Sequence, residues 1–366
     1  MIPFTLVLSS AAALIGQEPA TVAMRFDPPV GASLVVTSTE THDLLLEELV
    51  TRRGEGAPAP SEVALRLRSR LETSIAEGYR EEAGRLRRRY IALDGRLELV
   101  DPASVDEDSG EWRGDTLPLT SPFAGVSVTF QPAEEQPGGF GRHFDGRALR
   151  EGFLPTLDAP FDWGRFLPEA AGGTPDDLKV GARWELPAEV LQPLLAPGGF
   201  LAWRGDEKAD EQILRAFDCG VAGNHYLGFD GRVEGSVRAR LKSVGGETPA
   251  SRFAEVELEF DVTLRSDRSG FIEENRIEVE AVEGIKTLGA RLAAQVKGGA
   301  VIRWSLTDHQ PLGAVVLCDE VVELAVQVLP PDGVPVEQSI RMVGGLANRL
   351  KFMVAEQLPP HRTEGR

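Results

Sequence analysis

Long stretches of this chain alternate apolar and polar residues with a period of two, and this pattern most constrains the fold. In residues 251–265 the even positions from Ala254 to Leu264 are apolar, and acidic residues occupy four successive odd positions. The same alternation runs through residues 62–75, 233–242 and 291–307. A strand directs successive side chains to opposite faces, so each stretch predicts a strand with one buried and one solvated face. Antiparallel sheets commonly have this arrangement.

The alternating stretches are long compared with a usual strand of about 5–6 residues. Alternation returns in residues 314–328 and again in 336–354, where the alternative is a helix with Leu346, Leu350 and Met353 on one face. A long sheet with one continuous apolar face must curve or be covered. We therefore predict an all-β fold with minor α content, in which long antiparallel strands form one or two strongly curved half-barrel sheets.

Turn residues separate the predicted strands. The tripeptide Asp-Gly-Arg occurs at residues 94–96, 145–147 and 230–232, and Asp-Gly suits a tight hairpin. Asp308 to Pro311 predicts another turn, which makes Asp308 and His309 turn residues, not catalytic ones. The pair Gly298-Gly299 interrupts an alternating stretch and predicts a bulge or bend.

The composition along the chain predicts five regions. Residues 148–200 are rich in Pro, Gly and isolated aromatic residues, and we expect them to cover the concave side of the sheet with a short helix at Pro187–Gln192. The regions are a signal peptide (1–16), an N-terminal β region (17–147), the covering segment (148–200), a C-terminal β region (201–358) and a disordered tail (359–366).

The first 16 residues favour export. Ile2 to Ile15 is apolar or small, too short for a membrane span of about 20 residues, and is followed by polar Gln17 and Glu18. This stretch lacks the basic residues of a typical signal peptide, and a first core strand is the alternative. We expect a secreted or periplasmic protein without an integral membrane segment in the mature chain.

The charge excludes two classes of partner. The net charge is −18 and the sequence pI is about 4.8. Nucleic acids and anionic membrane surfaces attract basic proteins, so neither is an expected partner.

No catalytic or cofactor motif is present in the sequence. The five histidines show no zinc-binding spacing, and no Gly-x-Ser-x-Gly or phosphate-binding loop occurs. We predict no metal, no cofactor and no catalytic residue, although carboxylates dispersed along the chain could still form a hydrolytic pair.

The two cysteines, Cys219 and Cys318, could form a disulfide in an oxidising compartment. Two separate buried thiols are the alternative, because both cysteines lie in apolar surroundings.

Glu320 is the most unusual acidic residue. It shares parity with Cys318 and Val322, which would place it on the apolar face, where a carboxylate is costly and often functional. The neighbouring odd positions are also apolar, and in that register Glu320 would be solvated.

A short motif carries a resemblance. The run Leu178–Trp184 contains Val-Gly-Ala-Arg-Trp and precedes the long alternating stretches. This layout resembles secreted bacterial β-rich proteins of unknown function, whose strand pattern is similar to the periplasmic lipoprotein-carrier fold. The resemblance implies a curved antiparallel sheet around an apolar cavity with helices as a lid. The chain departs from that pattern in its length and its many acidic residues.

These observations favour a non-enzymatic protein that binds an apolar ligand or lipid on a concave face. The predicted ligand-binding residues are Leu258, Phe260, Ile302, Trp304 and Glu320. Two alternatives remain: a structural or interaction protein of the cell envelope with a filled core, and a hydrolase with dispersed carboxylates.

Overall fold

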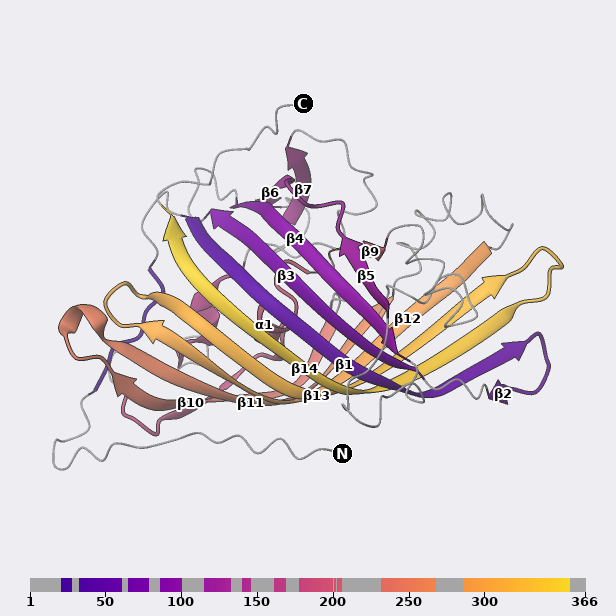
Figure 1. Ribbon diagram of the computed structural model, residues 1–366. Helices are drawn as coiled ribbons and strands as arrows, with labels where there is room; N and C mark the ends of the chain where they lie inside the picture. Colours follow the sequence, from indigo (N-terminus) through magenta and orange to yellow (C-terminus); the bar gives the residue numbers. More distant parts are fainter. Residues whose placement is uncertain are drawn as a thin grey trace.

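One antiparallel sheet forms the body of the protein (Figure 1). The computed structural model describes residues 21–27, 33–60, 65–78, 86–100, 115–132, 140–145, 161–168, 178–199, 201, 203–205, 232–267 and 286–355. Within these residues 14 strands join a single sheet, so the prediction of an all-β fold is confirmed, with one sheet and not two.

Four central strands of about twenty residues each determine the shape of the sheet. They are β1 (Ser33–Arg53), β12 (Lys286–Ser305), β13 (Gln310–Leu329) and β14 (Val336–Ala355). The other strands are β2 (Ala59–Pro60), β3 (Arg66–Gly78), β4 (Leu86–Val100), β5 (Asp115–Thr120), β6 (Ser127–Pro132), β7 (Phe140–Asp145), β8 (Arg183–Leu186), β9 (Arg204–Gly205), β10 (Arg232–Gly245) and β11 (Phe253–Asp267).

The strand order places the first and the last long strands side by side. Along the sheet the order is β7-β6-β4-β3-β1-β14-β13-β12-β11-β10-β8, with β2 and β5 paired beside this path and β9 paired with β5. The first long strand, β1, therefore pairs with the last, β14, in a register that runs from Ser33 opposite Ala355 to Arg53 opposite Val336. From β10 to β14, each strand pairs antiparallel with the next strand in the sequence.

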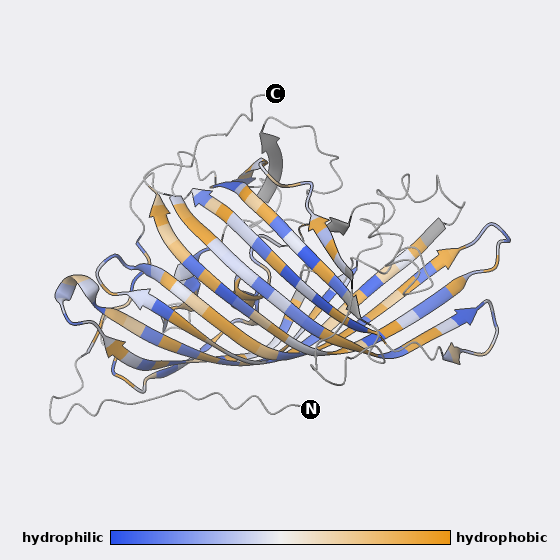
Figure 2. Ribbon diagram, in the orientation of Figure 1, coloured by the Kyte–Doolittle hydropathy of each residue, from blue (hydrophilic) through white to orange (hydrophobic). Residues whose placement is uncertain are grey.

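The alternating sequences form strands as predicted. In β11 and β13 the even residues are buried except Leu312, while their odd neighbours are intermediate or exposed except Pro311. Figure 2 shows the same alternation as bands of hydrophobic and hydrophilic residues along the long strands. The helix considered for the end of the chain is wrong: Leu346 and Leu350 are buried in β14, while Met353 is exposed on the opposite face.

The turn predictions had mixed outcomes. The turn predicted at 308–311 lies two residues earlier, at 306–309, and Gln310 and Pro311 already belong to β13. Asp308 and His309 are turn residues as predicted, and the Asp308 amide donates to Ser305 Oγ (2.9 Å). The hairpin predicted at 94–96 is wrong, because these residues lie inside β4 opposite β3. Gly95 is needed there for packing: a Cβ would lie 2.9 Å from the Leu119 side chain. The other two Asp-Gly-Arg tripeptides extend outside the described residues.

Glycines allow neighbouring strands to approach closely at two points in the sheet. The bulge predicted at Gly298-Gly299 is wrong, since β12 keeps its register with β11 and β13 through both residues. Instead, a Cβ on Gly298 would meet the backbone of Cys318, and a Cβ on Gly344 would meet the Asp43 carbonyl oxygen. Both glycines are therefore required by contact between strands.

Replacing Gly344 with alanine should lower the free energy of unfolding by about 1–3 kcal/mol, because the new methyl group overlaps backbone that has no freedom to move. Gly345→Ala is the matched control, since its Cβ would make an ordinary 3.4 Å contact with the Cys318 carbonyl oxygen. Urea denaturation of both variants measures the difference. Equal stability of the two variants would contradict the steric requirement for glycine at position 344.

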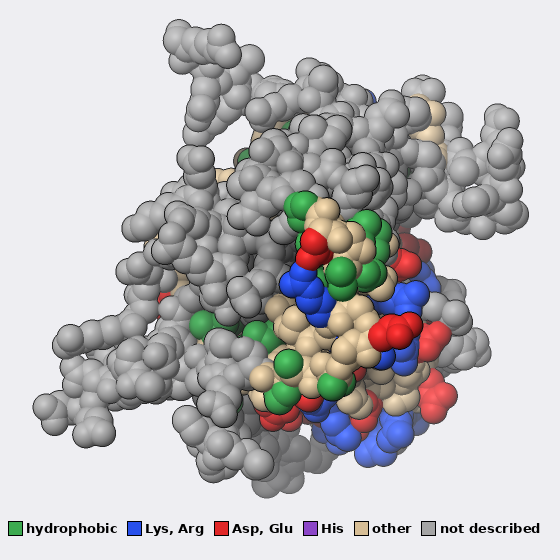
Figure 3. All heavy atoms as spheres, turned by 90° about the vertical axis from the view of Figure 1, so that its right-hand side faces the viewer, with side chains coloured by type: hydrophobic (Ala, Val, Ile, Leu, Met, Phe, Trp, Pro, Cys, Tyr) green, Lys and Arg blue, Asp and Glu red, His purple; other side chains and the backbone are tan. Residues whose placement is uncertain are grey.

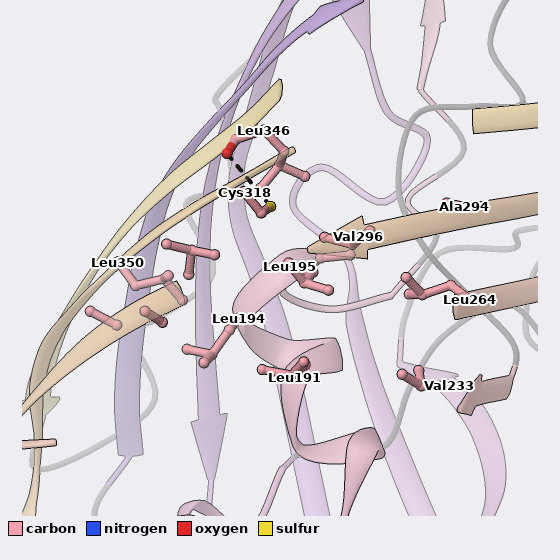
Figure 4. Packing of buried hydrophobic residues seen from close by; sticks show 14 of the residues in the cluster. Leu191, Leu194, Leu195, Val233, Leu264, Ala294, Val296, Cys318, Leu346 and Leu350 are labelled. Atoms are coloured by element: carbon pink, nitrogen blue, oxygen red, sulfur yellow. Dashed lines mark hydrogen bonds between the residues drawn. The ribbon is translucent and has the colours of Figure 1, made fainter. Parts of the chain in front are cut away.

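We call the described part of the covering segment, residues 161–168 and 178–199, the central segment; it lies inside the curve of the sheet (Figure 1). It contains the 3-10 helices η4 (Trp163–Phe166) and η7 (Ala188–Leu191) and the one-turn helix α1 (Gln192–Leu195). Leu191, Leu194 and Leu195 of this segment are fully buried, and Figure 4 shows them directed at the sheet face that carries Val296, Cys318 and Leu346. We call this face of the sheet the concave face, and the opposite face the convex face.

The predicted short helix at Pro187–Gln192 is close to the observed one. The 3-10 turn ends at Leu191, and α1 begins at Gln192 with Pro193 in its first turn. Pro193 therefore lies within the first turn of α1, where a proline loses no helical hydrogen bond.

Candidate functional site

The residues predicted to bind an apolar ligand lie on the concave face. Leu258, Phe260, Ile302 and Trp304 are each at most 4% exposed and belong to the continuous hydrophobic core. At Trp304 this face is filled by the chain itself: Phe26 packs edge-on against the indole at 6.1 Å, and the indole nitrogen donates to the Arg25 carbonyl oxygen (3.0 Å).

A buried ionic cluster occupies the same face where β1, β14 and β13 meet. His42 Nδ1 lies 2.8 Å from Glu320 Oε2, and His42 Nε2 lies 2.5 Å from Glu40 Oε1. All three side chains are at most 4% exposed. The solvated alternative for Glu320 is therefore wrong; its ligand-binding role stays a prediction. We call Glu40, His42 and Glu320 the Glu-His-Glu cluster.

Register explains how residues on non-adjacent strands meet. Glu320 on β13 lies opposite Gly344 on β14, and Gly344 lies opposite Leu44 on β1. Because Gly344 has no side chain, the Glu320 carboxylate can reach across β14 to His42. The sequence analysis missed Glu40 and His42, although both share parity with apolar Val36 and Leu44 in the same stretch.

The cluster strongly favours a protonated histidine. Burial by itself lowers the pKa of His42, but the charges of Glu320 and Glu40 and their hydrogen bonds raise that pKa to about 10. An imidazolium donates from both ring nitrogens, which matches the two carboxylate contacts. With both nitrogens engaged, His42 has no free position for a general base or a metal ion.

Three polar atoms around the cluster have no hydrogen-bond partner among the described residues: Ser69 Oγ, Glu320 Oε1 and Asn348 Oδ1. Ser69 lies opposite His42 on β3, and Asn348 lies opposite Glu40 on β14. The Nδ2 atom of the same Asn348 side chain donates to the Leu194 carbonyl oxygen of α1 (2.9 Å). Buried polar atoms normally have partners, so this region has unused capacity for a bound group.

Cys318 is a free, buried thiol in the structure. It contacts the Leu346 carbonyl oxygen at 3.7 Å (Figure 4), and burial, together with Glu320 and Asp319, raises its pKa far above the usual range. Cys219 lies outside the described residues, so the disulfide stays a prediction.

A second buried ion pair connects the central segment to the sheet. Arg88 donates to Glu77, and both side chains are at most 3% exposed. Arg88 and Tyr90 also reach the Gly198 carbonyl oxygen at 3.4 Å. This pair anchors the loop after α1 to β4.

Metal binding finds no support in the described part of the chain, where no group of three or more His, Cys, Asp or Glu side chains could hold an ion. His309 lies in the β12–β13 turn with a φ of 53°. His225 and His361 lie outside the described residues.

The convex face carries an open depression of about 480 Å³ across the ends of β11 to β14. Its charged lining includes Arg265, Arg291 and Arg341 beside Glu323, and the small residues Ala293 and Ala325 also line it. On the described surface at this end of the sheet, acidic and basic side chains lie side by side (Figure 3). The mixed charge gives this depression no clear ligand preference.

No described helix is long and apolar enough to cross a membrane.

Comparison with known proteins shows no family. No family model matches the chain, and no curated protein matches its sequence. Among solved structures, it is similar to one described as "lipid-protein interactions in lipovitellin", with a TM-score of 0.31 and 11% sequence identity. The similarity covers 92% of this chain and only 27% of that one. At this TM-score the similarity carries no functional argument, so function must be argued from the geometry of the chain itself.

Proposed function

We propose that the protein binds an apolar ligand, such as the acyl chain of a lipid, between the concave face and the central segment. This proposal rests on how the concave face is covered. A continuous apolar face extends across β10 to β14 and β1, yet among the described residues short pieces such as η7 and α1 lie over it. Burying apolar surface is worth about 25 cal/mol per Å², whether the cover is protein or ligand.

The hydrogen bonds that hold the central segment to the sheet favour its displacement by a ligand. Asn348 and Arg88 both hold the central segment through backbone carbonyl oxygens, at Leu194 and Gly198. Releasing such contacts leaves no unpaired charge on the segment itself. A ligand that replaces the leucines of α1 could therefore take over their apolar contacts at modest cost.

One contact, the packing of Phe26 on Trp304, supports the alternative of a filled core. It makes the protein a structural component of the cell envelope. The hydrolase alternative has no such support among the described residues, where the two buried carboxylates of the Glu-His-Glu cluster both contact His42. Export also remains part of our proposal, since residues 1–16 lie outside the described residues.

Native mass spectrometry of the exported chain tests the proposal. We expect extra mass that leaves on denaturation and is identified as lipid, and we expect a stripped sample to take up a long-chain alcohol. A bare chain that takes up no alcohol would overturn the proposal and favour the filled core.

A matched pair of variants locates the ligand. Ala300 is buried on the concave face, and Val301 beside it lies on the convex face. Ala300→Leu should reduce the retained lipid, whereas Val301→Leu should leave it unchanged. Equal retention by the two variants, with both folded by circular dichroism, would place the ligand elsewhere.

A further inference from the structure

We propose that the apolar ligand carries a positively charged hydrogen-bond donor, an ammonium group, which binds the free carboxylate oxygen of Glu320. This inference rests on the proposed function and names the class of ligand. A long-chain amine has the chemistry that the site would recognise.

The charge of the buried cluster is the first argument. Two carboxylates, Glu40 and Glu320, share one imidazolium, so the Glu-His-Glu cluster carries one excess negative charge when both carboxylates are ionised. A buried charge without a partner is costly, and a cation placed beside it offsets that cost. No Lys or Arg forms an ion pair with this cluster among the described residues.

The free atoms at the cluster give the second argument. Glu320 Oε1 and Asn348 Oδ1 are both acceptors without partners, and the side chains that carry them are at least nine-tenths buried. Acceptors need donors, and an ammonium group supplies three. A carboxylate or phosphate head group has acceptors where donors are needed, and its charge would be repelled.

The surroundings of Glu320 fit the apolar part of such a ligand. Its register neighbour on β12 is Val296, and the next buried residues along β13 are Val322 and Leu324. An alkyl chain that follows β13 away from Glu320 would meet only apolar side chains on that strand. The head group and the chain would thus bind on one face.

Three probes of equal chain length test the inference at neutral pH: dodecylamine, dodecanol and dodecanoate. Calorimetric titration of the stripped wild-type protein should show dodecylamine binding at least about tenfold tighter than dodecanoate, the ratio expected for a hydrogen bond to a charged group. Equal or tighter binding of dodecanoate would overturn the inference while leaving the proposed function intact. Failure of all three probes to bind would overturn both.

Charge-removing variants assign the preference to one residue. Glu320→Gln should abolish the preference for dodecylamine over dodecanoate and still bind dodecanol. Glu323→Gln is the control, because Glu323 lies on the same strand with its side chain 61% exposed on the convex face. It should keep the wild-type preference. If both variants keep the preference, Glu320 does not bind the head group; if Glu320→Gln does not fold, the wild-type ratio alone decides.

Discussion

Replacing His42 with alanine should lower the free energy of unfolding by about 3–5 kcal/mol, the usual cost of removing one partner from a buried ion pair. The variant leaves the Glu40 and Glu320 carboxylates buried without the cation that both contact. Urea denaturation at neutral pH measures the loss. A decrease below about 1 kcal/mol, typical of a surface ion pair, would show that the cluster is hydrated.

Two controls separate charge from packing. Adding Glu40→Gln and Glu320→Gln to His42→Ala should recover part of the lost stability, because no unpaired charge then remains buried. The pH dependence provides the second control. The pKa of His42 is raised from 6.5 to about 10 in the folded state, so its stabilisation is complete below pH 6.5 and is lost as the pH rises towards 10. Wild-type stability should fall across that interval more steeply than that of His42→Ala.

Replacing Trp304 with alanine should also lower the free energy of unfolding by about 3–5 kcal/mol, the range for truncating a large buried aromatic residue. The indole is 1% exposed, contacts Phe26 and donates to the Arg25 carbonyl oxygen. Its loss would leave a cavity and would release the segment that covers this end of the concave face.

Trp304→Phe isolates the hydrogen bond from the packing. This variant keeps an aromatic ring and should lose less stability than Trp304→Ala, while hydrogen exchange at residues 25–27 should increase in both. If Trp304→Ala loses no more stability than Trp304→Phe, the cavity is filled by rearrangement and the packing argument fails. Increased lipid uptake by Trp304→Ala would link the segment of residues 25–27 to ligand binding.

The sequence by itself determined the strands and their buried faces. The parity of 251–265 and of 314–328 is a local property, because the pleat directs alternate side chains to opposite faces wherever the strand lies in the sheet. For the same reason Trp304 and Phe260 could be assigned to the concave face. The hairpin turn at Asp308 was also local, since short polar side chains bond their own backbone.

Only the tertiary structure decided which strands meet. The contact between His42 and Glu320 joins residues 278 positions apart, and it exists because β14 pairs with both β1 and β13. Gly95 is a second case that local sequence could not predict. Its tripeptide has the composition of a turn, but the glycine allows close packing against Leu119 inside a strand. Parity predicts that a side chain is buried, whereas its partners depend on strand order and register, which are set by contacts between distant parts of the chain.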